Sequence, residues 1–474
     1  MVKTYGIFPA RQRPWRGGEI ERSETMRKKS GVLILTVLLL MFWVIPAHAE
    51  VYIQCPCLLL DANGKPDPTQ LNPAYGTFYN VATQNIECTI PGPPQRNIAC
   101  KALTAGDGHV TMADGNDIYV FGFDDVTGVP TNQVMNMVND PNLPGGMRGA
   151  ETTAPAIIMQ GGQEFYLSLT NVGMVERPDL TDAHTVHFHG FPNAGSVFDG
   201  EPMASIAIHM GETLTYYYNN VEPGTYIYHC HVEASEHMQM GMLGNLYVRS
   251  AQDGTLINGY TQFAYNDCPT YPVITPGCGS TGYDVGYPIE ITAFDPEFHH
   301  ADQTYNEVDF AFMTDTYTLL NGRGYPDTIN PCGRQTAYPT VPALWPACNG
   351  ADILNSLGVP SQNTPALIVA RAGQKILLHF PSLATVDFYT VTVLGLPMTI
   401  IGQGARQYRN FNGTTYYYNT GSITLGGGEG YDVLIDTAGK SPGTYFLYTT
   451  KLNYLSNDAE DFGGMMTEIV LTAP

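Results

Sequence analysis

The sequence predicts an all-β protein with two tandem Greek-key β-sandwich domains. Runs of about five to eight residues rich in Tyr, Val, Thr and Ile recur between turn signals, and 50 glycines and 34 prolines supply many of those turns. A chain of 474 residues has room for two such domains. The second half also repeats four short motifs of the first half in the same order, which indicates a duplicated domain.

The repeated motifs divide the chain. In order, they are Pro155-Ala-Ile-Ile with Pro365-Ala-Leu-Ile, His184 to Pro192 with Tyr389 to Pro397, Gly211-Glu212 with Gly428-Glu429, and Pro223-Gly-Thr-Tyr226 with Pro442-Gly-Thr-Tyr445. A run rich in Pro, Gly and Cys separates the two copies. We therefore expect a first sandwich at residues 102–255, a linker at 256–285 and a second sandwich at 286–474.

Residues 1–49 have the pattern of an upstream extension and a secretory signal. A basic stretch at 27–29 precedes an apolar run at 32–45, and small residues follow at 47–49. The apolar run is shorter than the about twenty residues of a transmembrane helix. We expect an exported protein in the periplasm, at the cell surface or outside the cell, without membrane attachment after cleavage. An uncleaved membrane anchor is the alternative.

The mature chain would be strongly acidic. Without residues 1–49 its net charge is near −27. Such a chain should avoid nucleic acid and anionic membrane surfaces, and it could attract metal cations or basic redox proteins. The same charge also serves solubility outside the cytoplasm, which is an equally good explanation.

Nine cysteines are present, and one of them, Cys230, lies between two histidines. The other eight form an even set, which in an exported protein implies up to four disulfides, paired within each of two clusters. The first cluster marks residues 50–101 as a loop-dominated extension rich in Cys and Pro. The clusters are Cys55, Cys57, Cys88 and Cys100, then Cys268, Cys278, Cys332 and Cys348.

Residues that could bind metal are most concentrated between His184 and Met242. A blue-copper centre uses two imidazoles, one thiolate and a weak axial thioether. Side chains alternate along a strand, so Cys230 should face away from its two histidine neighbours, and His187 should face away from His184. The sequence therefore predicts two sites back to back, one made of His184, Cys230, His237 and Met242, the other of His187, His189, His229 and His231.

These residues resemble the copper signature of multicopper oxidases and laccases. The resemblance rests on His-x-x-His-x-His-Gly followed by His-Cys-His, a further His and a Met, with a spacing from Cys230 to His237 that is two residues longer than usual. It implies cupredoxin-like domains, copper as cofactor, and an oxidoreductase activity. A type 1 copper would take electrons from a phenol, a metal ion or a redox protein. The four-histidine site would act as the catalytic copper site, with dioxygen as the acceptor.

The repeat predicts that the second domain has lost its copper ligands. Tyr389, Thr392 and Leu394 stand where His184, His187 and His189 stand in the first copy. The later replacements are Tyr448, Thr449, Thr450 and Glu460 for His229, Cys230, His231 and His237, and only a methionine remains, Met465 beside Met466.

This loss bears on the second copper site. The trinuclear cluster of the resembled family uses eight histidines, four from each of two domains. One domain of this chain brings four, so the site would either be a smaller copper centre or be completed across the interface of a homo-oligomer. Among the remaining histidines, His109, His209 and His379 fit structural roles. The pair His299-His300 is a less favoured candidate for metal binding.

Two other interpretations stay open. Copper nitrite reductase is a more distant resemblance, since His189 and His229 match two of its ligand positions, although His187 stands where that family carries an acid. The other interpretation is a non-enzymatic copper-binding or electron-transfer protein, for which Met238, Met240 and Met242 would be soft Cu(I) ligands. One copper per chain would support a carrier, whereas two or more would support an enzyme.

Overall fold

The structure is a computed structural model of the whole chain. It describes residues 52–135, 150–191, 195–219, 221–332 and 353–474, apart from 355, 357, 359, 459, 460 and 462. The expected export signal, Cys348 and Glu460 lie outside these residues. Two compact units are distinguished, residues 1–49 and residues 50–474, and the fold below is that of the second unit. No helix in the described part of the chain is long and apolar enough to span a membrane.

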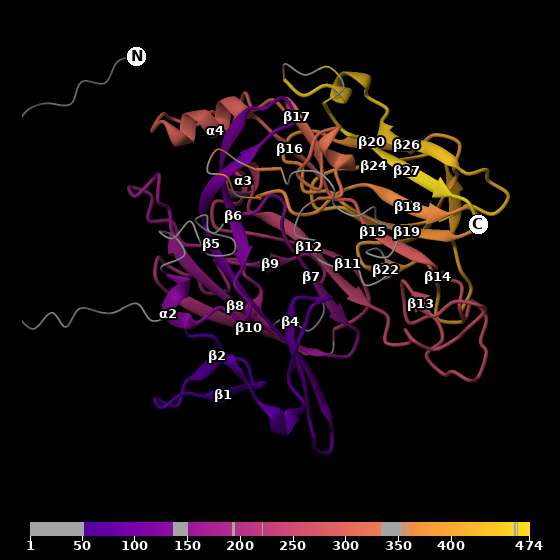
Figure 1. Cartoon of the computed structure of the whole chain (residues 1–474), viewed down its shortest axis with the longest axis horizontal. Coiled ribbons are helices and arrows are strands. Elements are labelled where there is room, and N and C mark those ends of the chain that lie inside the picture. The colour runs from indigo at the N-terminus through magenta and orange to yellow at the C-terminus, as the bar shows by residue number, and fades with distance from the viewer. Residues whose placement is uncertain are drawn as a thin grey trace, which may run out of the picture. The chain divides into compact units, whose positions relative to one another are not determined.

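Two packed sheets make up the first sandwich (Figure 1). The larger sheet has the order β10-β8-β5-β4-β3, with β6 also paired to β5, and the smaller has the order β7-β12-β11-β9. The larger sheet comprises β3 (Phe78–Asn80), β4 (Asn85–Ile90), β5 (Arg96–Thr111), β6 (Asp117–Asp125), β8 (Glu164–Gly173) and β10 (Thr213–Tyr218). The smaller comprises β7 (Ala154–Gln160), β9 (His187–Phe188), β11 (Gly224–His229) and β12 (Leu243–Arg249).

The second sandwich has the same plan. One sheet has the order β15-β19-β25-β21-β22, with β23 also paired to β21, and the other has the order β18-β27-β26-β20-β24. The first comprises β15 (Val285–Pro288), β19 (Lys375–Pro381), β21 (Met398–Gln403), β22 (Arg406–Gln407), β23 (Tyr418–Thr420) and β25 (Gly430–Asp436). The second comprises β18 (Ile368–Arg371), β20 (Tyr389–Val393), β24 (Ser422–Leu425), β26 (Gly443–Thr449) and β27 (Met466–Thr472).

The internal repeat of the sequence also appears in the order and register of the strands. The order β7-β12-β11-β9 returns as β18-β27-β26-β20, with the first pair parallel in both copies. His187 lies opposite His229 in the first domain, and Thr392 lies opposite Tyr448 in the second. The residues that the sequence alignment equates thus occupy equivalent places in the two sheets.

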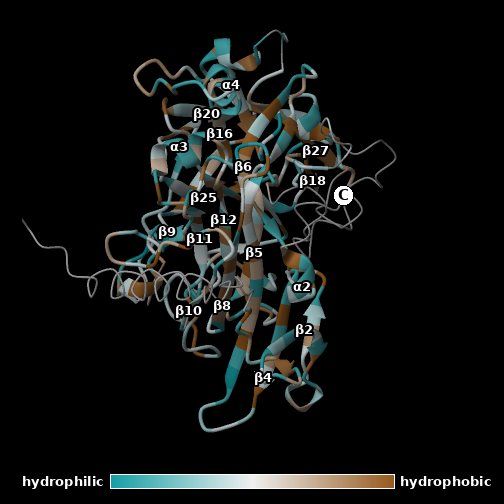
Figure 2. Ribbon diagram, turned by 90° about the vertical axis from the view of Figure 1, so that its left-hand side faces the viewer, coloured by the Kyte–Doolittle hydropathy of each residue, from teal (hydrophilic) through white to brown (hydrophobic). Residues whose placement is uncertain are grey.

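Residues 50–101 are not dominated by loops, so that expectation is wrong. They form β1 (Leu58–Leu60), β2 (Pro66–Leu71), β3, β4 and the start of β5, which runs through the expected boundary at 101 and 102 (Figure 2). The density of Cys and Pro suggested loops, yet the cysteines point inward and pack with Leu58, Ile86 and Ile98 in a small apolar cluster. Through β3, β4 and β5 the extension is continuous with the larger sheet of the first domain, whereas β1 and β2 pair as a separate two-stranded sheet.

The three disulfides whose two cysteines are both described pair within each cluster, as expected. Cys55 is bonded to Cys100, Cys57 to Cys88, and Cys268 to Cys278. Cys332 is also disulfide-bonded. Cys230 is a buried free thiol, which leaves it available as a ligand.

Short elements lie between the last strand of the first sandwich and the main strands of the second: β13 (Gln262–Phe263), β14 (Gly282–Tyr283), β16 (Ile291–Phe294), α4 (Pro296–Gln303) and β17 (Tyr317–Leu320). Two further helices, α2 (Thr131–Val134) and α3 (Ala234–Gln239), lie within the first domain. The two largest apolar cores follow the two domains. A buried polar contact also links the domains, because Thr225 of β11 lies 2.5 Å from both His379 Nδ1 and Asp432 Oδ1.

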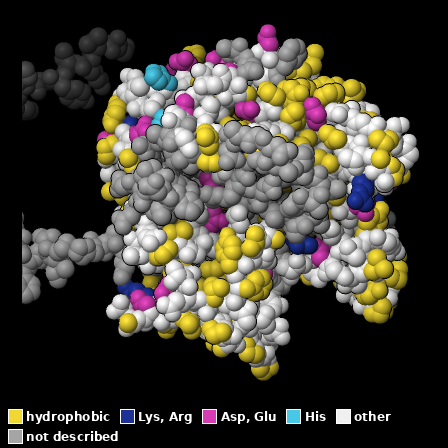
Figure 3. All heavy atoms as spheres, in the orientation of Figure 1, with side chains coloured by type: hydrophobic (Ala, Val, Ile, Leu, Met, Phe, Trp, Pro, Cys, Tyr) yellow, Lys and Arg dark blue, Asp and Glu magenta, His cyan; other side chains and the backbone are white. Residues whose placement is uncertain are grey.

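The surface of the N-terminal strands carries exposed hydrophobic side chains. Figure 3 shows hydrophobic side chains over the region where Figure 1 places β1, β2 and β4. Leu60 and Val81 are among the most exposed of these residues, with 62% and 76% of their surfaces accessible.

Candidate metal centres

The cysteine-containing group lies where β11 leads into α3. Cys230 follows β11, His237 lies on α3, and His184 comes shortly before β9. Cys230 Sγ is 3.2 Å from His237 Nδ1 and 3.8 Å from His184 Nδ1. The three ligand atoms lie within 4.8 Å of one another, and the side chains are buried. The structure thus brings together the two imidazoles and the thiolate expected from the sequence.

Met242 is held beside this group by its backbone. Its N–H donates to the His237 carbonyl at 2.8 Å, and its own carbonyl accepts from the Cys230 N–H at 3.1 Å. The preceding Gly241 has φ of +117°, and a side chain there would lie 2.8 Å from the Phe121 carbonyl oxygen, so the turn requires glycine. The buried Met242 side chain therefore belongs to the same tight turn as His237.

Electrostatics favour a thiolate at Cys230. Burial alone would raise the pKa of this thiol, but the charge of His237 and hydrogen bonds from both histidines hold the pKa well below its usual value. Burial likewise opposes charge on His237, yet the thiolate and Asp182 raise the pKa of His237 to about 10. A cation is thus favoured beside the sulfur, and copper bound by neutral imidazoles would supply that positive charge.

The other four histidines gather on the opposite side of β11. Ligand atoms of His187, His189 and His229 lie within 4.8 Å of one another. The ring of His231 lies 4.9 Å from that of His187 and 5.5 Å from that of His229, measured between centroids. Because His187 and His229 are direct partners across β9 and β11, strand pairing itself creates this group.

Backbone contacts on the outer side of these rings leave the inner nitrogens for metal. His187 Nδ1 lies 2.7 Å from the Asp199 carbonyl, and His229 Nδ1 lies 2.6 Å from the Cys230 carbonyl. Such acceptors assign the proton to Nδ1 and turn the lone pair of Nε2 inward.

The nitrogens that face inward converge on one point. His189 Nε2 and His229 Nε2 are 2.9 Å apart, while the other side of the His189 ring is hydrogen-bonded to the Gly428 backbone. Burial and the neighbouring imidazoles lower the pKa of His229 to about 3, so the ring is neutral at ordinary pH. Neutral nitrogen atoms that converge in this way fit a bound cation, and imidazole suits copper.

A cavity of about 420 Å³ opens onto this four-histidine group. First-domain residues on its wall include His189, His229 and His231, with Met238 of α3. The opposite wall comes from the second domain, at residues 383–388 and 427–428. Among the described residues, the second domain thus lines the cavity without adding a histidine to it.

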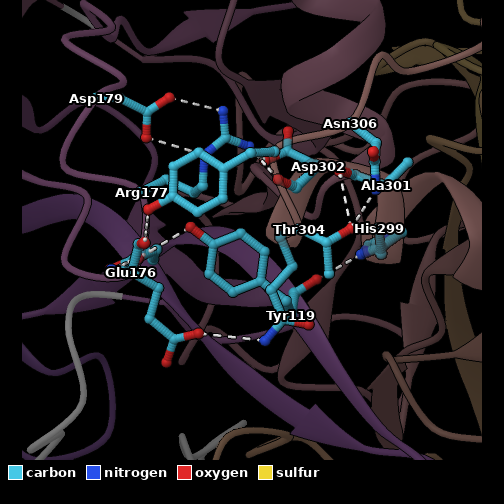
Figure 4. A network of polar contacts seen from close by, with 12 residues as sticks. Tyr119, Glu176, Arg177, Asp179, His299, Ala301, Asp302, Thr304 and Asn306 are labelled. Carbon is cyan, nitrogen blue, oxygen red and sulfur yellow. Dashed lines mark hydrogen bonds and ion pairs between the residues drawn. The ribbon is translucent and has the colours of Figure 1, made fainter.

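Three of the remaining histidines have side-chain partners within the protein. His109 lies between two carboxylates, with Nδ1 2.6 Å from Asp117 and Nε2 3.0 Å from Glu176. His379 is paired with Asp432 at 2.7 Å. His299 Nδ1 lies 2.6 Å from the Tyr119 carbonyl, as Figure 4 shows.

Sequence reasoning missed the surroundings of the cysteine site. Asp182 Oδ2 lies 3.8 Å from His237 Nε2. Because Asp182 stands only two residues before His184, its position near this site could have been predicted from the sequence. Arg177 bridges Asp179 and Asp302, and so ties the segment before His184 to α4 (Figure 4). That contact spans more than a hundred residues, so no local pattern could reveal it.

Comparisons with known proteins establish the family. Residues 149–253 and residues 292–472 each match a family model described as multicopper oxidase. The two matches together cover more than half of the chain, so the chain belongs to the multicopper oxidase family. No curated protein matches the sequence.

Solved structures show the same fold. Blue copper oxidase from Nitrosomonas europaea has 18% identity and a TM-score of 0.51, with 78% of this chain and 85% of that chain covered. The multicopper oxidase mgLAC has 17% identity and a TM-score of 0.50, with the same two coverages. Copper nitrite reductases also match, with lower TM-scores of 0.45 and 0.46.

Family membership makes the chain a copper-dependent oxidoreductase with two cupredoxin-like domains. The group of His184, Cys230 and His237 is compatible with a type 1 copper centre. Members of this family are typically exported, which agrees with the disulfides.

Proposed function

We propose that this protein accepts electrons at a type 1 copper and passes them to copper held by the four-histidine group. His184, Cys230 and His237 would hold the first copper, with Met242 as the weak axial ligand. His187, His189, His229 and His231 would hold the catalytic copper. Copper at these places would supply one-electron redox chemistry.

The observation that carries this proposal is the back-to-back arrangement around Cys230. The residue on each side of this cysteine is a histidine of the other group, and His229 Nδ1 also donates to the Cys230 carbonyl at 2.6 Å. An electron at the Cys230 sulfur therefore has a short covalent route through the backbone to either neighbour. Strand alternation keeps the two sets of ligands apart while their backbones remain continuous.

The protein's own residues prepare both sites for metal. At the first, His184 and His237 favour the thiolate form of Cys230, which is the form that binds copper. At the second, the carbonyls of Asp199 and Cys230 hold the His187 and His229 protons on Nδ1. These contacts orient the rings of His187 and His229, which would reduce the cost of ordering them when metal binds.

Access differs between the two sites. His184 and His237 expose only 1% and 0% of their surfaces, so a donor has to deliver electrons to the first site without touching a ligand. The four-histidine group opens onto the cavity, which gives a small acceptor such as dioxygen direct access. A phenol, a metal ion or a redox protein stays an expected donor, and export to the periplasm or cell exterior is part of the proposal.

Copper analysis combined with oxygen uptake tests this function. We expect two or more copper ions per chain, an intense blue colour in the oxidised protein, and oxygen consumption with at least one of phenols, Fe(II), Mn(II) or Cu(I). A copper-loaded protein without blue colour would rule out the first site. Determination of mass in solution would show whether a homo-oligomer contributes to the second.

A non-enzymatic copper-binding or electron-transfer role is the second candidate. Met238 supports it, because this soft ligand lies on the cavity wall beside His229 and His231. A single copper per chain and no oxygen uptake with any donor would favour this candidate. A nitrite reductase-like activity is less favoured, since the two family matches are both to multicopper oxidases.

A further inference from the structure

We propose that helix α4 of the second domain fixes the geometry of the type 1 copper site, with His299 as a positioning residue. This inference rests on the proposed function, because it concerns the ligands His184 and His237. Described residues of the second domain supply none of the ligands of this site. Nevertheless, α4 contacts both segments of the first domain that carry the two imidazoles.

His299 connects α4 to the segment that carries His237. Its Nδ1 lies 2.6 Å from the Tyr119 carbonyl on β6, and its ring also lies beside the Gln239 backbone on α3. Two residues further along β6, the Phe121 N–H donates to the Met240 carbonyl at 2.9 Å. One buried side chain thus lies at the junction of β6 and α3.

The β6 strand in turn contacts the ligand itself. The ring of Phe121 packs edge-on against the ring of His237, with centroids 5.7 Å apart. The Phe121 carbonyl also limits the turn at Gly241, between His237 and Met242. A shift of β6 away from α3 would therefore move an imidazole ligand and the axial methionine relative to Cys230.

Asp302 connects the same helix to the segment that carries His184. Its carboxylate lies 2.7 Å from Arg177 Nη1, and Arg177 also binds Asp179 (Figure 4). The Arg177 guanidinium stacks on the ring of Tyr305, 4.4 Å from its centroid. Gln303, the last residue of α4, donates to Glu176 at 3.2 Å. Residues 176–179 precede His184 by only a few positions, so α4 holds both imidazole segments at once.

The helix is itself well anchored. Asp295 caps its N-terminus by accepting from Glu297 N–H at 2.9 Å, and its other carboxylate oxygen accepts from Thr314 N–H at 2.8 Å. Pro296 occupies the first turn, where proline is favoured. Phe298 belongs to the apolar core of the first domain. Because these contacts hold α4 in place, the helix can in turn fix the positions of the segments that it contacts.

Histidine has the properties that this place requires. The side chain is buried, and burial lowers the pKa of His299 to about 4, so the ring stays neutral and adds no charge beside the copper site. Its Nδ1 proton is used by the Tyr119 carbonyl, and none of the candidate metal groups in the described residues includes His299. A positioning role therefore accounts for this histidine better than metal binding does.

The test compares spectra of copper-loaded, full-length variants. His299→Leu removes the donor, and we expect a shifted or weakened blue absorption band, an altered copper EPR spectrum and about tenfold weaker retention of copper against a chelator. His300→Leu is the matched control, because His300 is the next residue on the same helix and is exposed. This control should keep the wild-type spectrum.

Rescue distinguishes positioning from simple loss of packing. The amide nitrogen of asparagine reaches the place of Nδ1, whereas that of glutamine extends beyond it. His299→Asn should therefore keep the wild-type EPR spectrum, and His299→Gln should not, even where His299→Leu fails to fold. Wild-type spectra in both amide variants, or equal changes in both, would overturn the proposal.

Failure of this inference is separable from failure of the proposed function. A wild-type protein that binds copper without blue colour would remove the type 1 assignment itself. A blue wild-type protein whose His299 variants match the His300→Leu control would leave the type 1 site intact and reject only the positioning role.

Discussion

At the scale of single residues, alternation along one strand separates two kinds of chemistry. A step of one residue turns Cys230 toward His184 and His237, while its two neighbours face the other histidines. This could be predicted from the sequence because the period of a strand is a local property. Which ring nitrogen each histidine presents to a metal could not be predicted from the sequence. The groups that orient His187 and His189 are the Asp199 carbonyl and the Gly428 backbone, and neither is adjacent to its histidine in the chain.

Replacement of the thiol tests the first site. Cys230→Ser should abolish the blue absorption, because serine cannot supply the thiolate that produces it. The number of disulfides should stay unchanged, since Cys230 is unpaired. Absorption spectra and thiol titration of the denatured protein measure both. A blue Cys230→Ser protein would mean that another residue is the ligand.

Removal of one imidazole tests the second site. His229→Ala should lower oxygen uptake by at least about tenfold, because one inward-facing nitrogen is lost. Most of the blue absorption should remain, since the ligands of the first site are unchanged. His379→Ala is a useful comparison, because this histidine pairs with Asp432 and lies outside both groups. Full activity of His229→Ala would contradict the assignment.

At the scale of elements, the main surprise is how the second domain touches the first. The start of the α4 helix could have been predicted from Asp295 and Pro296, because the first is a capping residue and the second is favoured at the first helical position. Its docking on β6 could not, because that contact depends on two segments almost two hundred residues apart. The N-terminal strands were not predicted for another reason. Because the disulfide-bonded cysteines are buried, the alternation of polar and apolar residues along β4 was not apparent in the sequence.

A buried carboxyl group between the domains makes stability depend on pH. Glu290 is fully buried and accepts from Asn245 Nδ2 of β12 at 2.6 Å, and burial raises its pKa to about 8. The folded state therefore holds this proton more tightly than the unfolded state does. The stabilisation is complete below about pH 4.5 and is lost as pH rises toward 8, by at most about 1.4 kcal/mol per pH unit.

Glu290→Gln should remove this dependence. The variant should gain stability relative to wild type as pH rises from 5 to 8, because the amide keeps an acceptor for Asn245 and never ionises. Thermal unfolding at several pH values measures the difference. Glu307→Gln, at an exposed position, should show no such trend. A constant difference between Glu290→Gln and wild type would show that Glu290 does not titrate in this range.

At the scale of the whole molecule, the two copies of the domain differ, because the candidate copper ligands lie in the first copy and the second copy lines the cavity beside them. The common strand order and the repeated register were predictable, because the motifs return in order along the sequence. The use of the second copy as a cavity wall was not predictable, since residues 383–388 and 427–428 come from separate loops.

Removal of copper should destabilise the protein. A ligand that binds only the folded state stabilises it, by about 2.7 kcal/mol when present at a hundredfold excess over its dissociation constant. We expect a chelator to bleach the blue colour and lower the midpoint of thermal unfolding, and copper to restore both. Cys230→Ser should show a smaller loss, because only the second site remains. An unchanged midpoint in wild type would mean that the folded state does not bind copper tightly.

The described disulfides and the buried Cys230 thiol have a consequence for biogenesis. In an exported chain, Cys230 would have to reach the folded state unpaired although eight other cysteines would be exposed to the same oxidising conditions. Both N-terminal bonds join residues that precede Cys230, namely Cys55 with Cys100 and Cys57 with Cys88. If the chain is exported from its N-terminus, as proposed, those partners would emerge first and could close before Cys230 arrives. That order would keep the four N-terminal cysteines from pairing with Cys230.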